Sequence, residues 1–192
     1  MRTIFAAIFV LFASVSCLSQ VVKDDPYKMT PTLEKLADID LANQILPVLM
    51  TKDQINKLLP VIEKCRTNVR AQAKKEADRI KALQGEIDKV HGEAYKGMVP
   101  SKEFLDKITS LFTKFANERV GVSLANSLLL FERLKETLND GQKKAVVGVV
   151  DRIFNEENKK WEDGTADRKL QYFGATLILG DRGYDMLVKL AK

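Results

Sequence analysis

The sequence predicts an all-α protein: a long antiparallel helical hairpin with additional short N- and C-terminal helices. Apolar residues recur at intervals of three and four through residues 51–95 and again through residues 101–134, which is the period of an amphipathic helix. A short segment containing Gly97 and Pro100 separates the two stretches. Because Gly and Pro end helices and a short connection returns the chain alongside itself, the two helices are expected to pair as a hairpin.

The N-terminal segment predicts export from the cytoplasm. Arg2 provides a positive start, residues 4–13 form an apolar run, and small residues that include Cys17 and Ser19 follow it. This order is typical of a secretory signal peptide. The run of ten residues covers only about half of a bilayer's ~30 Å hydrocarbon core, which argues against a membrane anchor.

Processing of this segment would divide the chain into three parts. We expect residues 1–19 to be a cleaved signal peptide, residues 20–29 a polar leader, and residues 30–192 a single all-helical domain. The mature protein would then be periplasmic or secreted. The alternative is cleavage before Cys17, which would make the protein an outer-membrane lipoprotein, although Ser14 stands where the lipoprotein pattern has a leucine-like residue. We expect contact with a membrane only in that case.

Composition narrows the classes of partner. The chain has 31 Lys and Arg against 26 Asp and Glu, and loss of Arg2 with the signal peptide leaves a mature net charge of +4. This mild excess suits acidic or amphipathic partners and does not by itself indicate nucleic acid. Without Cys17, Cys65 has no second cysteine for an internal disulfide, and burial as a small apolar side chain is favoured over an intermolecular thiol.

The mature chain begins with two short helical segments. Pro31 suits the first turn of a helix, because its missing N–H is not needed there. Leu33, Leu36 and Ala37 give this helix an apolar face. Residues 41–49 form a second short apolar stretch that contains a proline.

The hairpin itself follows. Its first helix is expected to run continuously from Thr51 to Tyr95, about 65 Å at ~1.5 Å per residue. Pro60 is expected to kink this helix or to start it anew. A helix of this length is typical of a coiled-coil-like arm that pairs with another arm. Ser101 is expected to cap the returning helix, whose apolar face continues to Leu134.

The last third of the chain is expected to remain helical. Asn139 starts a helix whose core face extends to Phe154, and residues 161–164 end it. The segment from 165 to 192 is expected to form one helix, a turn at Gly180 and a short final helix, although glycine and threonine weaken its middle.

Two segments have the pattern of a capping box: Met50-Thr51-Lys52-Asp53-Gln54 and Leu138-Asn139-Asp140-Gly141-Gln142. In each, the Thr or Asn side chain is expected to accept a hydrogen bond from the first turn, and the Gln is expected to reach back to the N–H of the cap residue. The apolar residue before the cap can pack on the first turn. Capping boxes are common, so two ordinary helix starts are the plain interpretation.

These two segments, MTKDQ and LNDGQ, resemble the twice-repeated LTxxQ motif of the Spy/CpxP family of periplasmic proteins. Met50 replaces Leu in the first motif, and Asn139 replaces Thr in the second while keeping its capping chemistry. The resemblance covers roughly residues 41–160. It implies a cradle-like homodimer of long helical hairpins that acts as an ATP-independent chaperone of unfolded envelope proteins or as a stress-response regulator.

We expect no catalytic, cofactor or metal site. The single histidine, His91, has Glu93 nearby and no further donor at helical spacing, whereas a bound zinc needs more ligands. The sequence has no Gly-rich phosphate loop. Its carboxylates alternate with Lys and Arg, as on solvated helix faces. The protein is therefore expected not to be an enzyme.

Three cations mark one face of the first arm. Arg66, Arg70 and Lys74 recur every four residues and so share a face, which we call the basic strip. A solvated surface is the ordinary interpretation. The functional interpretation is a candidate client-binding surface that attracts acidic or unfolded polypeptides, which neighbouring apolar side chains then hold. Nucleic acid is not expected, because no aromatic residues interleave with these cations.

Two functions of different class therefore compete. The first is an ATP-independent periplasmic chaperone or stress-response protein that holds unfolded or acidic polypeptides. The alternative is a structural, coiled-coil-like envelope protein or assembly partner without clients. Exposed apolar residues beside the basic strip would favour the first, and an apolar stripe buried wholly in the partner arm would favour the second.

Overall fold

The computed structural model describes residues 31–155 and 159–192, and the expected signal peptide, the leader and Cys17 lie outside the described residues. The prediction of an all-α fold is confirmed. The helices are α2 (Pro31–Ile45), α3 (Lys52–Ala82), α4 (Gln84–Ala94), α5 (Lys102–Thr137), α6 (Asp140–Val149), α7 (Ala166–Phe173) and α8 (Asp181–Ala191). The short elements are a 3-10 turn η1 (Leu46–Val48), a π-helical segment η2 (Gly174–Ile178), and strands β1 (Ile153–Asn155) and β2 (Lys160–Glu162).

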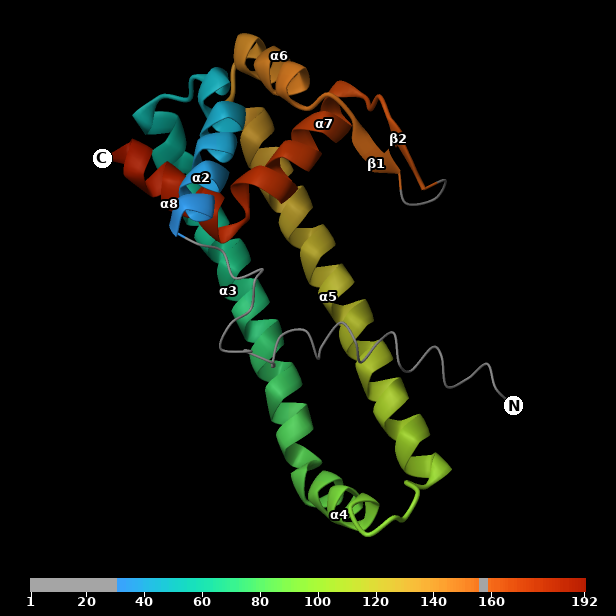
Figure 1. The fold of residues 1–192 in the computed structure, drawn as a ribbon. Coiled ribbons are helices and arrows are strands. Elements are labelled where there is room, and N and C mark those ends of the chain that lie inside the picture. The colour runs from blue at the N-terminus through green and yellow to red at the C-terminus, as the bar shows by residue number, and fades with distance from the viewer. Residues whose placement is uncertain (1–30, 156–158) are drawn as a thin grey trace.

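The predicted hairpin is the dominant feature of the fold. Helices α3 and α5 run antiparallel along each other, and α4 with the following turn connects them at one end (Figure 1). The 36 residues of α5 correspond to about 54 Å at ~1.5 Å per residue. The remaining helices gather around the opposite end of the hairpin (Figure 1), so the connecting end projects away from them.

The prediction of one continuous helix from Thr51 to Tyr95 is wrong. Helix α3 ends at Ala82, and the N–H of Leu83 turns back to the carbonyl of Ile80 at 3.0 Å. Gly85 follows at once and weakens the helix where α4 bends toward α5 (Figure 1). The chain does not start anew at Pro60, which lies inside α3.

The first two predicted segments form one helix and one 3-10 turn. Helix α2 is held to α8 by Arg182, which donates to the carbonyl of Glu34 at 3.0 Å and to the carboxylate of Asp38 at 3.1 Å. The apolar face predicted for this helix is exposed at Leu33 and Leu36. Ile45, the last residue of α2, is the point at which this segment enters the core.

The main core lies at the end of the hairpin where the other helices gather. Ile55, Leu58 and Ile62 of α3 belong to one buried cluster with Leu130 and Leu134 of α5. The same cluster takes in side chains of α6, α7, η2 and α8: Val146, Leu170, Phe173, Ile178 and Leu187. This cluster anchors the C-terminal segment against the base of both arms.

The C-terminal segment approaches α5 closely at one glycine. A Cβ added at Gly174 would lie 2.9 Å from Cδ1 of Leu134, so this contact requires the absence of a side chain. The predicted succession of a helix, a turn at Gly180 and a short final helix is confirmed as α7 with η2, then α8.

The helix predicted from Asn139 is shorter than expected. Helix α6 ends at Val149, and Ile153 and Phe154 lie in β1, so their assignment to a helical core face is wrong. β1 pairs antiparallel with β2, and Phe154 lies opposite Trp161 with ring centroids 5.5 Å apart. β-Branched and aromatic residues favour such a pair, and the cross-strand ring contact stabilises it. No helix in the described part of the chain is long and apolar enough to cross a membrane.

Candidate functional site

Both capping boxes are formed as the sequence predicts. At α3, the Thr51 hydroxyl accepts from the N–H of Gln54 at 3.2 Å, and the Thr51 N–H donates to the Gln54 side chain at 2.9 Å. At α6, the Asn139 side chain accepts from the N–H of Gln142 at 2.9 Å, and the Asn139 N–H donates to the Gln142 side chain at 3.0 Å. The flanking Met50 packs against the core and Leu138 is buried in it.

The two motifs also bind each other, which the local pattern did not predict. Gln54 and Gln142 lie 88 positions apart in the chain, yet each side-chain amide donates to the oxygen of the other, at 2.8 and 2.9 Å. The second hydrogen of Gln54 reaches the carbonyl of Thr137 at 2.8 Å, and that of Gln142 reaches the carbonyl of Leu49 at 2.9 Å. Each of these carbonyls lies two residues before the cap of the opposite motif.

The hydrogen-bonding capacity of both amides is thus fully used. A primary amide offers two donors and two acceptor positions. Each of the two glutamines donates to one carbonyl and one amide, and accepts from one cap N–H and one amide. Leu49 presents its carbonyl from a left-handed conformation, with φ at 52°. The pair therefore joins the starts of α3 and α6 and fixes the base of the hairpin.

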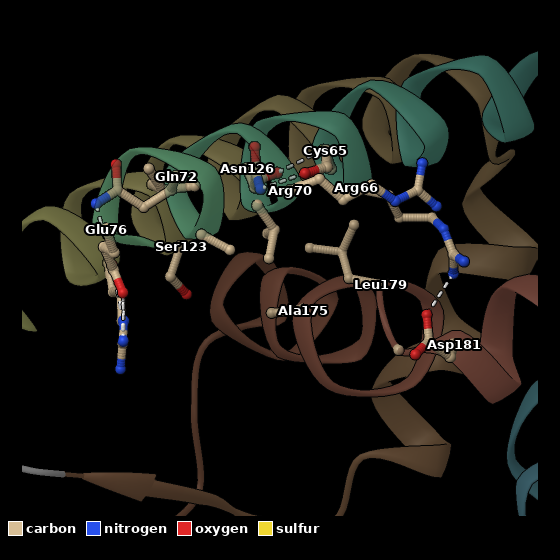
Figure 2. A pocket seen from close by; sticks show the side chains of 15 residues that line it. Cys65, Arg66, Arg70, Gln72, Glu76, Ser123, Asn126, Ala175, Leu179 and Asp181 are labelled. Atoms are coloured by element: carbon tan, nitrogen blue, oxygen red, sulfur yellow. Dashed lines mark hydrogen bonds and ion pairs between the residues drawn. The ribbon is translucent and has the colours of Figure 1, made fainter. Parts of the chain in front are cut away.

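A groove lies farther along the arms, between α3, α5 and the segment that joins η2 to α8. We call it the arm groove; its volume is about 850 Å³. Val69 and Ala73 come from α3, Val122 and Ser123 from α5, and Leu179 from the C-terminal segment. Figure 2 shows Ala175 and Leu179 across the groove from Cys65 and Asn126. Short and apolar side chains leave this space between the helices.

An ion pair bounds each end of the arm groove. Arg66 binds Asp181 at 2.6 Å at one end, with its guanidinium 4.4 Å from the centroid of the Tyr184 ring. At the other end, Nε of Arg119 donates to the two carboxylate oxygens of Glu76 at 2.9 and 3.0 Å. Glu76 lies ten positions after Arg66, which corresponds to about 15 Å of helix, so the groove is long enough for a short peptide segment.

The Glu76 end is part of a larger polar network between the arms. Gln72 donates to Glu76 at 3.1 Å and to Glu118 at 2.9 Å, and Arg79 pairs with Glu118 at 2.7 Å. The hydrogen bond from Arg119 lowers the pKa of Glu76, and those from Gln72 and Arg79 lower the pKa of Glu118. Both carboxylates are therefore charged at neutral pH.

The basic strip is only partly available to a partner. Arg66 and Arg70 line the arm groove, and both bind Glu63, at 3.3 and 2.8 Å. Lys74 lies outside the lining and pairs with Asp78 at 2.7 Å. The sequence pattern showed the shared face of the three cations, and Glu63 and Asp78 lie at helical spacings from Arg66 and Lys74; the contact of Arg66 with Asp181 could not be read from it.

Asn126 was missed by the sequence analysis. It is buried on α5, donates to the carbonyl of Cys65 at 3.0 Å and accepts from Asn68 at 2.8 Å. A signal was present, because Asn126 lies four residues from both Val122 and Leu130 in an otherwise apolar row. A single buried amide between two helices fixes their register.

Cys65 is buried, as predicted, and its thiol lies 3.7 Å from the carbonyl of Asn126. Burial raises the pKa of this thiol, so it remains protonated and is a poor nucleophile. His91 stacks edge-on with Tyr95 at 4.8 Å between ring centroids. Among the described residues, no group of three or more His, Cys, Asp or Glu side chains is placed to hold a metal ion.

Comparisons with protein-family models, with curated proteins and with solved structures find no match to this chain. The resemblance to the Spy/CpxP family therefore rests on the two short motifs.

Proposed function

We propose that the protein is an ATP-independent chaperone that holds short segments of unfolded exported polypeptides in the arm groove. The observation that carries this proposal is the exposure of Val69, which is 54% accessible although it lies on a groove wall between Arg66 and Arg70. An exposed apolar side chain flanked by cations is the combination that a client segment with apolar and acidic residues would fit.

The form of the groove supports a polypeptide ligand. Its floor offers apolar contact from Ala73, Val122 and Leu179, and charged groups stand at both ends. Such a surface binds apolar side chains without requiring one particular sequence. The absence of a Gly-rich phosphate loop from the sequence agrees with holding that is not driven by ATP. The two linked LTxxQ-like motifs, through their resemblance to periplasmic chaperones, support the same proposal.

An aggregation assay tests the proposal. Purified protein is added, without ATP, to a denatured substrate that aggregates on dilution, and light scattering is followed. We expect wild type to suppress aggregation and Val69→Ser to require several-fold more protein for the same effect, because the substitution removes apolar contact. Ala73→Phe, which fills the groove, should be impaired as well.

Val120→Ser is the matched control for Val69→Ser. Val120 is 67% exposed on α5 and does not line the groove, so the same chemical change occurs at similar exposure. Thermal melts must show that all variants remain folded. Failure of wild type to protect the substrate, with the fold intact, would contradict the proposal and favour a structural envelope protein without clients.

The basic strip has a separate test. Reversing the charge at Arg66 would also break its contacts with Asp181 and Tyr184. The informative variant is therefore Arg70→Glu with Lys74→Glu. We expect slower association of an acidic unfolded client at low salt. The difference should shrink at high salt, because the Debye length falls from ~10 Å at 0.1 M to ~3 Å at 1 M.

The control for this double variant carries the same change in net charge at a distance from the groove. Lys57 and Lys144 are exposed and lie outside the groove lining. Lys57→Glu with Lys144→Glu should leave the association rate closer to that of wild type. Equal slowing by both double variants would show that net charge acts, and would remove the basic strip from the mechanism.

A further inference from the structure

The turn between the arms has a fixed conformation. At the end of α4, the N–H of Met98 donates to the carbonyl of Glu93 at 3.1 Å and the N–H of Gly97 to that of Ala94 at 2.9 Å. This pair of bonds is the Schellman motif, which needs a left-handed residue. Gly97 supplies it, with φ at 84°. The residues that follow are therefore held in a defined position beyond the helix.

This turn presents apolar side chains to solvent. Tyr95 is 83% and Val99 88% exposed, and Met98 is half exposed. Helix α4 has no buried residue, so the end of the hairpin has no enclosed core into which these side chains could fold. The turn also lies at the end of the arms that is remote from the other helices (Figure 1). We call residues 95–102 the distal loop.

The charge of the distal loop has one sign. Residues 94–102 contain Lys96 and Lys102 and no Asp or Glu. Lys102 pairs with Asp106 at 3.5 Å and remains 86% exposed, while Lys96 has no carboxylate partner in the part of the chain that the structure describes. The nearest acids in sequence, Glu93 and Glu103, belong to α4 and α5.

We propose that the distal loop is a contact surface for an anionic phospholipid membrane. Tyr95, Met98 and Val99 enter the head-group region, and Lys96 and Lys102 bind lipid phosphates. Tyrosine is favoured at the membrane interface because its ring is apolar and its hydroxyl polar, and lysine can extend its ammonium group toward phosphate. This contact depends neither on lipid attached to Cys17 nor on the proposed holding of clients.

A membrane fits this loop better than a peptide does. A depression of about 370 Å³ lies between α4 and the start of α5, but its walls include Glu86, Glu93 and Glu103 beside Lys89 and Lys107. Met98 and Val99 also line this depression, whereas Tyr95 and Lys96 lie outside it. Tyr95, Lys96 and Val99 are all largely exposed, so the loop presents apolar and basic groups to solvent, which matches the chemistry of an anionic interface.

Vesicle flotation tests this proposal. Protein that begins at Gln20, and therefore lacks Cys17 and any lipid at that position, is mixed with vesicles of phosphatidylglycerol and phosphatidylcholine or of phosphatidylcholine alone. We expect binding to the anionic vesicles and much weaker binding to the zwitterionic ones. Lys96→Ser should weaken anionic binding about fivefold, the change expected for one cation near such a surface.

The apolar contribution is tested with matched variants. Tyr95→Ser with Val99→Ser should weaken binding about tenfold. Val120→Ser with Leu124→Ser changes two exposed apolar residues of α5 outside the loop and should have little effect. Lys57→Ser is the corresponding control for Lys96→Ser. The client-protection assay on the loop variants should give wild-type values, which separates this contact from the proposed chaperone function.

Insertion has an independent readout. Trp161 is the single tryptophan of the chain, so Val99→Trp in a Trp161→Phe background reports on the loop alone. Its fluorescence should shift to the blue when anionic vesicles are added. Equal binding by the loop and control variants would overturn the proposal, and so would no binding to either kind of vesicle or no blue shift. It would also be overturned if the loop substitutions weakened binding to peptides but not to vesicles.

Discussion

The paired glutamines allow a quantitative test of how the base of the hairpin is held. Gln54→Ala removes the bond from the Thr51 N–H at 2.9 Å, the bond to the Thr137 carbonyl at 2.8 Å and the two amide bonds shared with Gln142. At a net ~1 kcal/mol for each bond, reduced where water replaces a lost partner, the expected loss of unfolding free energy is roughly 2–3 kcal/mol. Gln142→Ala should cost a similar amount.

The double variant makes the test specific. Each single variant already loses the two bonds shared by Gln54 and Gln142, so the double variant should lose less stability than the sum of the two single variants. In a double-mutant cycle this difference, the coupling energy, should be about 1–2 kcal/mol. Urea unfolding followed by circular dichroism measures the four stabilities. Gln84→Ala, at an exposed glutamine of α4, is the control and should be near neutral. Additive effects of the two substitutions would refute the pairing, even if each cap matters alone.

The remaining predictions concern the caps, acid and processing. Thr51→Ala and Asn139→Ala should each cost ~1 kcal/mol, measured by thermal melts, and loss of client protection without loss of stability would show that the motifs bind clients. Because the pKa of Glu76 and that of Glu118 are lowered below 4.5 in the folded protein, their stabilisation is present above that pH and is lost as the pH falls through the lowered values. Melts between neutral and acid pH should show this loss, with a shallower fall for Glu76→Gln; equal slopes would contradict it. Mass spectrometry of the exported protein should find Gln20 as its first residue, and an intact Met1 on the abundant form would contradict the signal-peptide prediction.

Local signals in the sequence predicted the helix starts. A capping box is complete within five residues, so Thr51 and Asn139 could be identified as caps without knowledge of the fold. The same pattern predicts the hydrogen-bond partner of each glutamine's side-chain oxygen, namely the N–H of the cap residue. It predicts no partner for the side-chain N–H groups of Gln54 and Gln142. Those unassigned donors were the available sign of a long-range contact, but nothing in the sequence specified that the two amides would meet.

The errors occurred where different structures share one pattern. The spacing of Ile80, Leu83 and Ile87 suits a continuous helix, and the end of α3 after Ala82 depends on the turn toward α5. Ile153 and Phe154 likewise fit a helical period and a short strand equally well. Periodicity records which residues are apolar, and the pairing of β1 with β2 is decided by tertiary contacts.

In the candidate site, too, the sequence could not predict contacts between residues that are far apart in the chain, as the basic strip shows. Its three cations follow one another at four-residue spacing on α3, but only Arg66 and Arg70 line the arm groove. Arg66 pairs with Glu63 three residues before it and also with Asp181, which lies 115 positions away, so this second carboxylate could not be found from the spacing. The arm groove depends on the same long-range packing, because Leu179 of the C-terminal segment lines it together with residues of α3 and α5.

The central claim is that unfolded polypeptides bind in the arm groove, and site-specific photo-crosslinking tests it most directly. A photoreactive amino acid is placed at Val69 in the groove or at Val120 outside it, and each protein is irradiated with a denatured client. We expect abundant crosslinks from Val69, few from Val120, and competition by excess unlabelled client. Equal crosslinking at both positions, or crosslinks from Val69 only to a second copy of this chain, would contradict it.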